Sequence, residues 1–451
     1  MKGKLVLAVV LALLFVWSLP GVIALRHLLL LLSLLFLAGL YDSRNYDETM
    51  RSVLRANWIP ASLFALLTGW FVVQAVFVSS EPDWALGELS GQWATAIMAL
   101  MVGIMLALAS RAGKIPDPMT VTTALMSVML LQAAIAVGQS VFDWIRHGDL
   151  LRQQVPLTGG KLEMSFLLNI VLAALVIDLL RRACRTGSFL RLPFAVIVAA
   201  VLLVLFCAYL SGSRNGVLGV LFLSASAIIL FVIDQHRQRG WEMAAIGGLL
   251  ALFFVSGFAL FSYQGDSRWR VFSESAALGW DIDNHKAWGD MNRHPLPRLD
   301  TGERVDESAY LRVAFIHAGI RLIAENPLGV GYGRNAFAHA LEKTGNANVG
   351  HTHSGFIDLT IGGGLPALAL WLAFIVSLMV AGGVAYFRGG NPQGLLLFLL
   401  VTGHSGRMVL DSVNRDHMLQ IFLFLVGYLL IVVSTSRSPT SASASHAQRP
   451  A

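Results

Sequence analysis

Long runs of hydrophobic residues alternate with short polar segments along most of the chain. About 20 consecutive apolar residues in an α-helix cross the hydrocarbon core of a bilayer. Runs of roughly this length occur at twelve places, near residues 4–19, 21–40, 57–79, 91–110, 119–141, 164–180, 192–210, 215–233, 241–262, 365–387, 394–410 and 418–434. The pattern therefore predicts an all-α, polytopic membrane helix bundle of about 12 transmembrane helices.

Composition supports a chain that lies largely in lipid. Hydrophobic residues make up 56% of the 451 residues and charged residues 13%, whereas a soluble chain carries about 25% charged residues. The formal net charge is +6. A basic excess in a membrane protein mostly reflects arginines in cytoplasmic loops, so we expect no nucleic-acid partner.

The distribution of positive charge predicts the orientation. With the N-terminus in the cytoplasm, the inside segments hold 16 Lys and Arg residues, and the short outside segments with the outer helix ends hold 7. Because cytoplasmic loops are enriched in positive charge, both termini are predicted to be cytoplasmic. The Ser-rich tail after Thr435 has the composition of a disordered segment.

One long polar segment interrupts the hydrophobic pattern. Residues 263–352 hold 21 of the 60 charged residues, and the alternation of spans puts them outside. Loops of this length usually carry function. The predicted division of the chain is residues 1–262 with transmembrane helices 1–9, residues 263–352 as a large periplasmic loop, residues 353–436 with helices 10–12, and residues 437–451 as a disordered cytoplasmic tail.

A helix is predicted inside this loop. Asp306 or Ser308 can cap its first turn, and Pro327 stops it. Charged residues interrupt the run and argue against a thirteenth span, so we expect the helix on the outer membrane surface or docked onto the bundle. Its apolar positions fall on one face: Leu311, Phe315, Ala318 and Leu322.

Two groups of outer arginines are candidates for binding an anion. Ser213 and Arg214 lie in the Gly-rich turn of residues 211–216, where backbone N–H groups and a guanidinium suit phosphate oxygens. A helix-hairpin turn with a snorkelling arginine explains the same residues. Arg312 and Arg321 lie on the loop helix, where an arginine can equally be a solvated charge.

His351-Thr352-His353-Ser354 stands where the loop re-enters the bundle. A histidine at this interface is a candidate general base, because its pKa lies near neutrality. The pair could also bind a metal with Asp358 as third ligand, or serve structure alone. No further acidic or cysteine cluster supports a metal, so none is predicted.

A last group of ionisable residues surrounds the outer end of the eleventh span: His404, Arg407, Asp411, Arg415, Asp416 and His417. Ionisable residues within membrane spans are functional candidates. The i, i+4 spacing of Arg407 and Asp411 also allows an internal ion pair that requires no function.

Outer arginines with a histidine base, and without a carboxylate dyad or metal, suit a donor whose leaving group is already anionic. A sugar linked through diphosphate is such a donor. Its departure needs cations that stabilise the developing charge, and the attacking hydroxyl needs a base. A donor with a long lipid on the far side of the diphosphate also requires a helix bundle that opens laterally.

Several segments resemble the O-antigen ligase and polymerase superfamily. Residues 325–333 (ENPLGVGYG) are similar to its Pro-Leu-x-Gly-x-Gly run, residues 351–354 to its His-x-His-Asn/Ser segment, and residues 362–366 to its glycine-rich helix entry. His353-Ser354 followed by Gly364 matches the ligase spacing, whereas Ala367 departs from the small or hydroxyl residue expected there. Ser213-Arg214 and Arg312 resemble the family's outer-face arginines.

The resemblance implies a membrane-embedded, GT-C-like glycosyltransferase that is inverting and needs no metal or other cofactor. It would transfer O-antigen glycan from undecaprenyl diphosphate onto lipid A-core in the bacterial inner membrane, with its active site facing the periplasm. It assigns catalysis to His353 and His351, and diphosphate binding to Arg214 and Arg312. The additional supporting residues that we predict are Ser213, Arg321, Arg407 and Asp411.

The compact loop and the His353–Gly364 spacing favour a ligase over the alternatives within the superfamily, an O-antigen polymerase and a protein O-oligosaccharyltransferase. A transporter of lipid-linked glycan is the non-enzyme alternative. A transporter should place its ionisable residues near the membrane midplane at broken helices, whereas here they gather at the outer ends.

Overall fold

The computed structural model describes residues 2–41, 51–148, 155, 157–264, 270–342 and 349–434. In this part of the chain the structure is helical, and the β-pairing is one isolated bridge between Arg298 and Arg304. The helices are α1 (Lys2–Val16), α2 (Ile23–Ala38), α4 (Trp58–Phe77), α5 (Pro82–Glu88), the π-helical η1 (Leu89–Trp93), α6 (Ala94–Arg111), α7 (Pro118–His147), α8 (Lys161–Ala183), α9 (Phe194–Ser211), α10 (Arg214–Arg239), α11 (Trp241–Gln264), α12 (Phe272–Trp280), the 3₁₀-helical η3 (Lys286–Trp288), α13 (Glu307–Glu325), α14 (Ala336–Glu342), α15 (Gly355–Gly389), α16 (Pro392–Leu410) and α17 (Asp416–Ser434).

The prediction of an all-α polytopic membrane protein is confirmed. Each of the twelve predicted spans coincides with a helix. Within the described ranges, eight helical segments are long and apolar enough to cross a membrane: Trp58–Phe77, Pro82–Arg111, Pro118–His147, Lys161–Ala183, Phe194–Ser211, Gly355–Gly389, Pro392–Leu410 and Asp416–Ser434. The other four coincide with α1, α2, α10 and α11, and their crossing stays a prediction.

Helix α17 forms the centre of the bundle, since 89% of the residues in its 18-residue apolar stretch are buried. It packs closely on α6 through two glycines. A Cβ on Gly103 would lie 2.0 Å from the Phe424 carbonyl oxygen, and one on Gly427 would lie 2.5 Å from that of Leu100. Small residues let membrane helices approach at backbone distance, where dispersion contacts accumulate.

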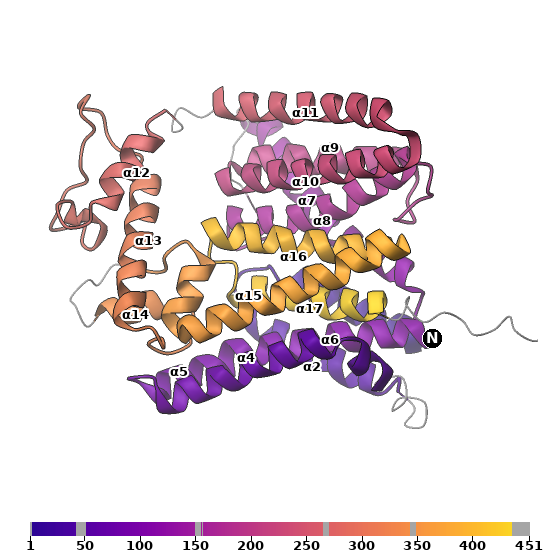
Figure 1. The fold of residues 1–451 in the computed structure, drawn as a ribbon, viewed down its shortest axis with the longest axis horizontal. Helices are drawn as coiled ribbons and strands as arrows, with labels where there is room; N and C mark the ends of the chain where they lie inside the picture. The colour runs from indigo at the N-terminus through magenta and orange to yellow at the C-terminus, as the bar shows by residue number, and fades with distance from the viewer. Residues whose placement is uncertain are drawn as a thin grey trace, which may run out of the picture.

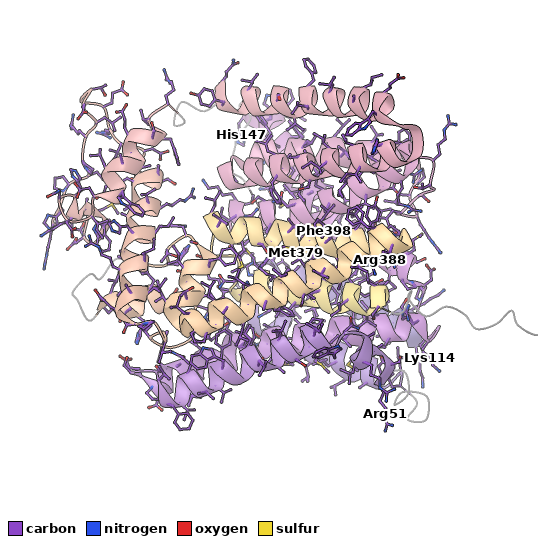
Figure 2. All side chains as sticks on the ribbon, viewed as in Figure 1. Arg51, Lys114, His147, Met379, Arg388 and Phe398 are labelled. Carbon is purple, nitrogen blue, oxygen red and sulfur yellow. The ribbon has the colours of Figure 1, made fainter. Side chains whose placement is uncertain are left out.

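The long polar loop gathers at one end of the bundle. In Figure 1, α12, α13 and α14 lie at the left, and α13 runs across the ends of the spans, while the chain begins at the right. Figure 2 labels Arg51, Lys114 and Arg388 towards the end where the chain begins. These basic residues, all predicted to be cytoplasmic, therefore lie at the end opposite the loop.

The predicted loop helix is present as α13. The side chain of Asp306 caps it by accepting a hydrogen bond from the Ser308 N–H at 3.1 Å. Phe315 and Ala318 lie in a buried cluster with the other two predicted apolar positions packed against it. A Cβ on Gly319 would approach side chains of residues 352 and 357 within 3.1 Å, so the helix is docked on the bundle at the start of α15.

A short helical segment precedes the predicted tenth span. α15 covers Gly355–Gly389, but Gly364 is non-helical, with φ +77° and ψ 178°, so that the part expected from residue 365 onward follows this kink. At the kink, Leu365 N–H donates to the Pro327 carbonyl oxygen at 2.8 Å, and Val330 N–H donates to the Ile361 carbonyl oxygen at 2.9 Å. Glycine tolerates this left-handed φ and therefore allows the sharp break between the two helical segments. The predicted tail, residues 437–451, lies outside the described residues.

Candidate functional site

The His351–Ser354 turn is held by one carboxylate at the start of α15. Asp358 Oδ1 accepts hydrogen bonds from the Thr352 N–H at 2.9 Å and from its hydroxyl at 2.8 Å, and Oδ2 accepts one from the Ser412 hydroxyl. Ser354 Oγ donates to the Met408 carbonyl oxygen at 3.2 Å. The turn is therefore fixed to the segment that joins α16 and α17.

This anchoring maintains an uncommon backbone conformation. His353 has φ +58°, which non-glycine residues rarely adopt and which costs about 1–3 kcal/mol. The side chains of His351 and His353 lie together with ring centroids 4.3 Å apart, and the His353 ring is stacked on Phe315 of α13 at 6.2 Å. The two histidines thus form one cluster between the turn and the loop helix.

Two arginines surround the histidine pair. Arg415 Nη2 lies 3.5 Å from His351 Nε2. Burial, with the charges of Arg415, His353 and Arg312, lowers the pKa of His351 to about 3. Burial, followed by the charge of Arg312, lowers the pKa of His353 to about 4, although Asp411 acts in the opposite direction. Both imidazoles are therefore neutral at physiological pH, the state in which a histidine can accept a proton.

Arg407 and Asp411 form the predicted i, i+4 ion pair, with Nη2 and Oδ2 3.1 Å apart and both side chains almost fully buried. Arg407 also donates to Ser165 Oγ at 2.9 Å and to the Leu162 carbonyl oxygen at 3.2 Å. The Asp411 carbonyl oxygen accepts the Gly355 N–H at 3.1 Å. The pair therefore joins α8 and α16 to the turn that carries the histidines.

The Ser-Arg turn begins α10. Ser213 is the N-cap, since its hydroxyl accepts the Gly216 N–H at 3.1 Å. A Cβ on Gly216 would lie 2.9 Å from the Ser165 Cβ, so the turn packs on the residue that Arg407 also contacts. The Arg214 side chain lies outside the described part of the structure.

Arg321 is not among the residues that the fold brings to the histidines. Its guanidinium makes two hydrogen bonds to the Asp283 carboxylate, at 2.7 and 2.6 Å, on an exposed part of the loop. This pairing raises the pKa of Arg321 above its ordinary value. In the structure, Arg321 ties α13 to the segment that follows α12.

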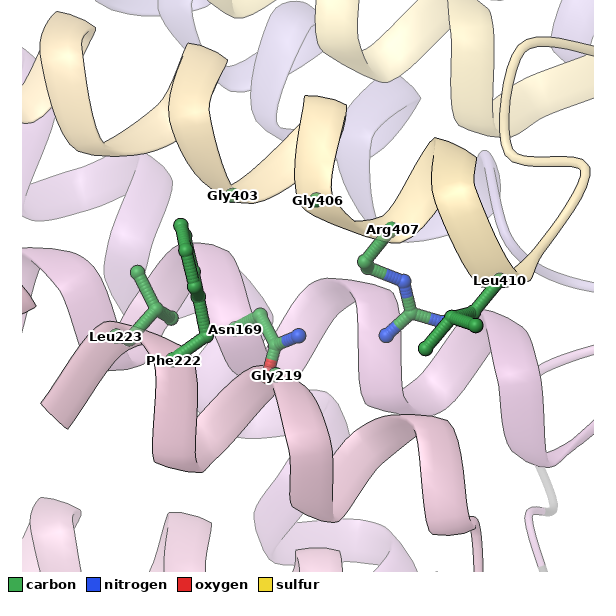
Figure 3. Close-up of a pocket in the computed structure, with 8 residues that line it drawn as sticks. All are labelled: Asn169, Gly219, Phe222, Leu223, Gly403, Gly406, Arg407 and Leu410. Atoms are coloured by element: carbon green, nitrogen blue, oxygen red, sulfur yellow. The ribbon is translucent and has the colours of Figure 1, made fainter. Parts of the chain in front are cut away.

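A largely apolar cavity of about 240 Å³ lies between α8, α10 and α16. Figure 3 shows Asn169 and Arg407 pointing into the space between α16 and α10. The lining residues are Asn169, Gly219, Phe222, Leu223, Gly403, Gly406, Arg407 and Leu410. Arg407 lines the cavity and also pairs with Asp411. The cavity therefore adjoins the ion pair and, through it, the histidine turn.

His404, one turn before Arg407, is buried among aromatic rings. Its ring is stacked on Phe422, with centroids 3.8 Å apart and planes 8° apart, and it also contacts Phe166 and Trp371. The predicted cluster at the end of α16 thus divides into a histidine in the bundle interior, a buried ion pair, and a group at the start of α17.

The central part of the chain matches a known family. Residues 199–372, from α9 to the helix beyond the Gly364 kink, match the family model described as O-Antigen ligase. This match covers less than half of the 451 residues, so the central part of the chain is similar to the O-antigen ligase family. No curated protein matches it. Its coarse function is therefore that of the membrane glycosyltransferases of ligase or polymerase type, and the matched segment includes the histidine turn, α13 and the kink.

The described side chains offer little to a metal ion. Among the residues that the structure describes, no group of three or more His, Cys, Asp or Glu side chains is arranged to hold one. Asp358, the third ligand weighed from the sequence, instead accepts hydrogen bonds from Thr352 and Ser412. The independence from metal remains a prediction.

Several residues of the site gave little signal in the sequence. Ser165 and Ser412 belong to no recognisable motif, and only the fold brings them to Arg407 and Asp358. Arg415 was noted as one of a charged group, but its approach to His351 depends on how the 411–416 segment returns to the turn. Positive charge at the outer end of a span was the available signal for Arg415.

Proposed function

We propose that the chain is an O-antigen ligase that transfers glycan from undecaprenyl diphosphate onto lipid A-core, with inversion at the anomeric carbon. The observation that carries the proposal is the neutral histidine pair with Arg312 and Arg415 around it, next to a cavity that lies among membrane helices. Such a site can bind an anionic leaving group and accept one proton.

In the proposed step, an acceptor hydroxyl attacks the anomeric carbon from the face opposite the diphosphate. The new C–O bond forms as the bond from that carbon to the diphosphate oxygen breaks. The diphosphate leaves as an anion, and His353 takes the hydroxyl proton. His351 supports His353 from its side, with the ring centroids 4.3 Å apart. A positioned base contributes typically about 10²–10⁴-fold to the rate.

Arg214 and Arg312 are proposed to bind the donor diphosphate. A guanidinium binds two phosphate oxygens through a planar fork, which a lysine ammonium cannot reproduce. Alanine at either position should therefore lower transfer in a folded protein, and lysine should restore little. Arg293, an exposed arginine paired with Asp290 on the outer loop, offers a matched control as Arg293→Ala. Wild-type transfer rates in both the Arg214→Ala and Arg312→Ala variants would contradict the proposal.

The lipid end of the donor needs an apolar path beside the diphosphate. The 240 Å³ cavity offers one, because glycine and apolar side chains line most of it and Arg407 lies at its polar end. In this proposal Arg407, Asp411 and Ser213 support the site through the ion pair and the helix cap. Arg321, which Asp283 holds on the loop surface, supports the position of α13.

The deciding experiment is reconstitution of the purified protein with undecaprenyl diphosphate-linked glycan and, in separate reactions, lipid A-core, a second lipid-linked glycan or a pilin acceptor. Transfer to lipid A-core supports the ligase. Elongation of the lipid-linked glycan would assign the chain to the polymerases, and transfer to pilin would assign it to protein glycosylation. Glycan movement across vesicles without transfer would identify a transporter.

We further propose that the bundle lies in the bacterial inner membrane, with both termini cytoplasmic and residues 263–352 in the periplasm. Cysteine substitutions test this orientation with an impermeant thiol reagent on intact spheroplasts. Thr301→Cys, on an exposed part of the loop, should be labelled, and Ser443→Cys should not. Labelling of Ser443→Cys in intact cells would reverse the orientation.

A further inference from the structure

A second group of basic side chains lies where the turn between α1 and α2 meets the start of α17. Arg26 Nη2 donates to the Leu19 carbonyl oxygen at 3.2 Å, so its guanidinium lies at this turn. Trp17 Nε1 donates to Gln420 Oε1 at 2.7 Å. Because Gln420 is one helical turn after His417, the α1–α2 turn lies against the first turn of α17.

Charged side chains from several elements surround this group. The charges of Arg26, Arg415 and Asp416 all reach His417, and that of Asp416 also reaches Arg26. The Asp416 carboxylate lies 3.5 Å from the Arg334 guanidinium, which is itself paired with a second carboxylate. Arg334 is thus shared between Glu88 and Asp416, and the charge of Arg415 also reaches Asp358. Asp416 is the carboxylate whose charge reaches Arg26.

Protein acceptors satisfy Arg26 and Arg415 only in part. Among the described residues, the buried Nε of each arginine and the buried Nε2 of His417 have no hydrogen-bond partner. By contrast, the Arg321 guanidinium makes two hydrogen bonds to the Asp283 carboxylate, at 2.7 and 2.6 Å. A partly satisfied guanidinium strongly favours an anion with several acceptor oxygens, because hydrogen bonds between ionised groups are about twice as strong as neutral ones.

We propose that Arg26, Arg415 and His417 bind the phosphate group of a membrane lipid. Lipid is the favoured source because the neighbouring apolar side chains Ile23 and Leu25 are 62% and 43% exposed on the outside of the bundle. Within the transfer reaction this phosphate belongs to the acceptor lipid, since Arg214 and Arg312 are assigned to the donor, and that last step rests on the proposed function.

The position of the group links it to the histidine pair. Arg415 is shared, because it directly precedes α17 and its Nη2 lies 3.5 Å from His351 Nε2. A lipid phosphate bound here would therefore hold the lipid's headgroup beside the proposed base. The site thereby differs from the donor site in its elements: the α1–α2 turn and α17, in place of α10 and α13.

The test measures lipid binding, which does not depend on transfer activity. The full-length protein in detergent is incubated with dioleoyl phosphatidic acid or with dioleoylglycerol, which lacks the phosphate, and bound lipid is counted by native mass spectrometry. Wild type should retain phosphatidic acid over dioleoylglycerol. Arg26→Gln with His417→Gln should lower its occupancy about tenfold, Arg26→Lys should retain most of it, and Arg293→Gln should match wild type.

Two arms separate the outcomes. Inorganic phosphate at millimolar concentration should compete weakly if the lipid is the ligand; complete competition would keep the phosphate site but assign it to a soluble anion. Thermal unfolding of each variant identifies loss of fold. If the double variant does not fold, the single variant Arg26→Gln decides, since it should lose phosphatidic acid whereas Arg26→Lys should retain it. Equal phosphatidic acid occupancy in wild type and the double variant would overturn the site, whether or not the chain proves to be a ligase.

Discussion

Replacement of Asp358 tests how the turn that carries the histidines is held. Its Oδ1 accepts both hydrogen bonds from Thr352, and its Oδ2 accepts the one from Ser412. Asp358→Asn retains an oxygen for the two Thr352 bonds, and its amide can donate to the serine oxygen. Asp358→Ala removes all three acceptors. The two variants therefore separate the hydrogen bonds from the charge.

The expected loss of activity depends on whether each hydrogen-bond donor can find another acceptor after the substitution. After Asp358→Ala, the two hydroxyls can rotate, and the Thr352 hydroxyl already contacts the Ser354 carbonyl oxygen at 3.0 Å. The Thr352 N–H cannot rotate, and the residue is fully buried. An orphaned buried N–H costs about 1–3 kcal/mol, which shifts a two-state equilibrium about 5- to 150-fold. Because His353 sits at a strained φ, the released turn is expected to relax.

The assay is the single-turnover rate of glycan transfer at saturating donor, with thermal unfolding measured in the same detergent. Asp358→Ala should lose up to about 150-fold in rate, Asp358→Asn much less, and Ser412→Ala should fall between Asn and wild type. Donor binding should be little changed. Equal rates for the Ala and Asn variants, with both proteins folded, would refute the reasoning, because the hydrogen bonds to Thr352 would then not hold the base.

Four further outcomes are expected. Gly364→Ala should lower the unfolding temperature, since φ +77° costs about 1–3 kcal/mol and the new Cβ would lie 2.3 Å from neighbouring backbone, whereas Gly389→Ala meets nothing within 4 Å and should be neutral; equal melting would contradict this. His353→Ala should lower single-turnover transfer by about 10²–10⁴-fold and His351→Ala by less, and the reverse order would move the base to His351. Because protonation blocks the base, kcat/KM should fall only as the pH drops towards the His353 pKa of about 4. Arg312→Gln removes a positive charge and should therefore move this acidic fall in kcat/KM to higher pH. A fall centred near pH 6.5 in the wild type would contradict the assignment. Transfer should survive EDTA, and a loss restored by one divalent ion would argue for a metal.

The sequence by itself determined the fold class, because bilayer-length apolar runs can satisfy their backbone groups in lipid as helices. It also determined α13, whose cap at Asp306 and stop at Pro327 are local signals. The ion pair of Arg407 and Asp411 was equally predictable, since i, i+4 residues are neighbours on any helix. These features depend on contacts a few residues apart, which sequence spacing specifies.

Only the tertiary structure decided which groups meet around the histidines. Asp358 contacts Ser412, and Arg415 reaches His351, across 54 and 64 residues of sequence. Arg321, predicted as a supporting residue on the same helix as Arg312, faces Asp283 because α13 turns that side towards the segment after α12. Residue type cannot distinguish such cases: the partner of a charged side chain is set by helix rotation and by which helices pack together, and both depend on the whole bundle.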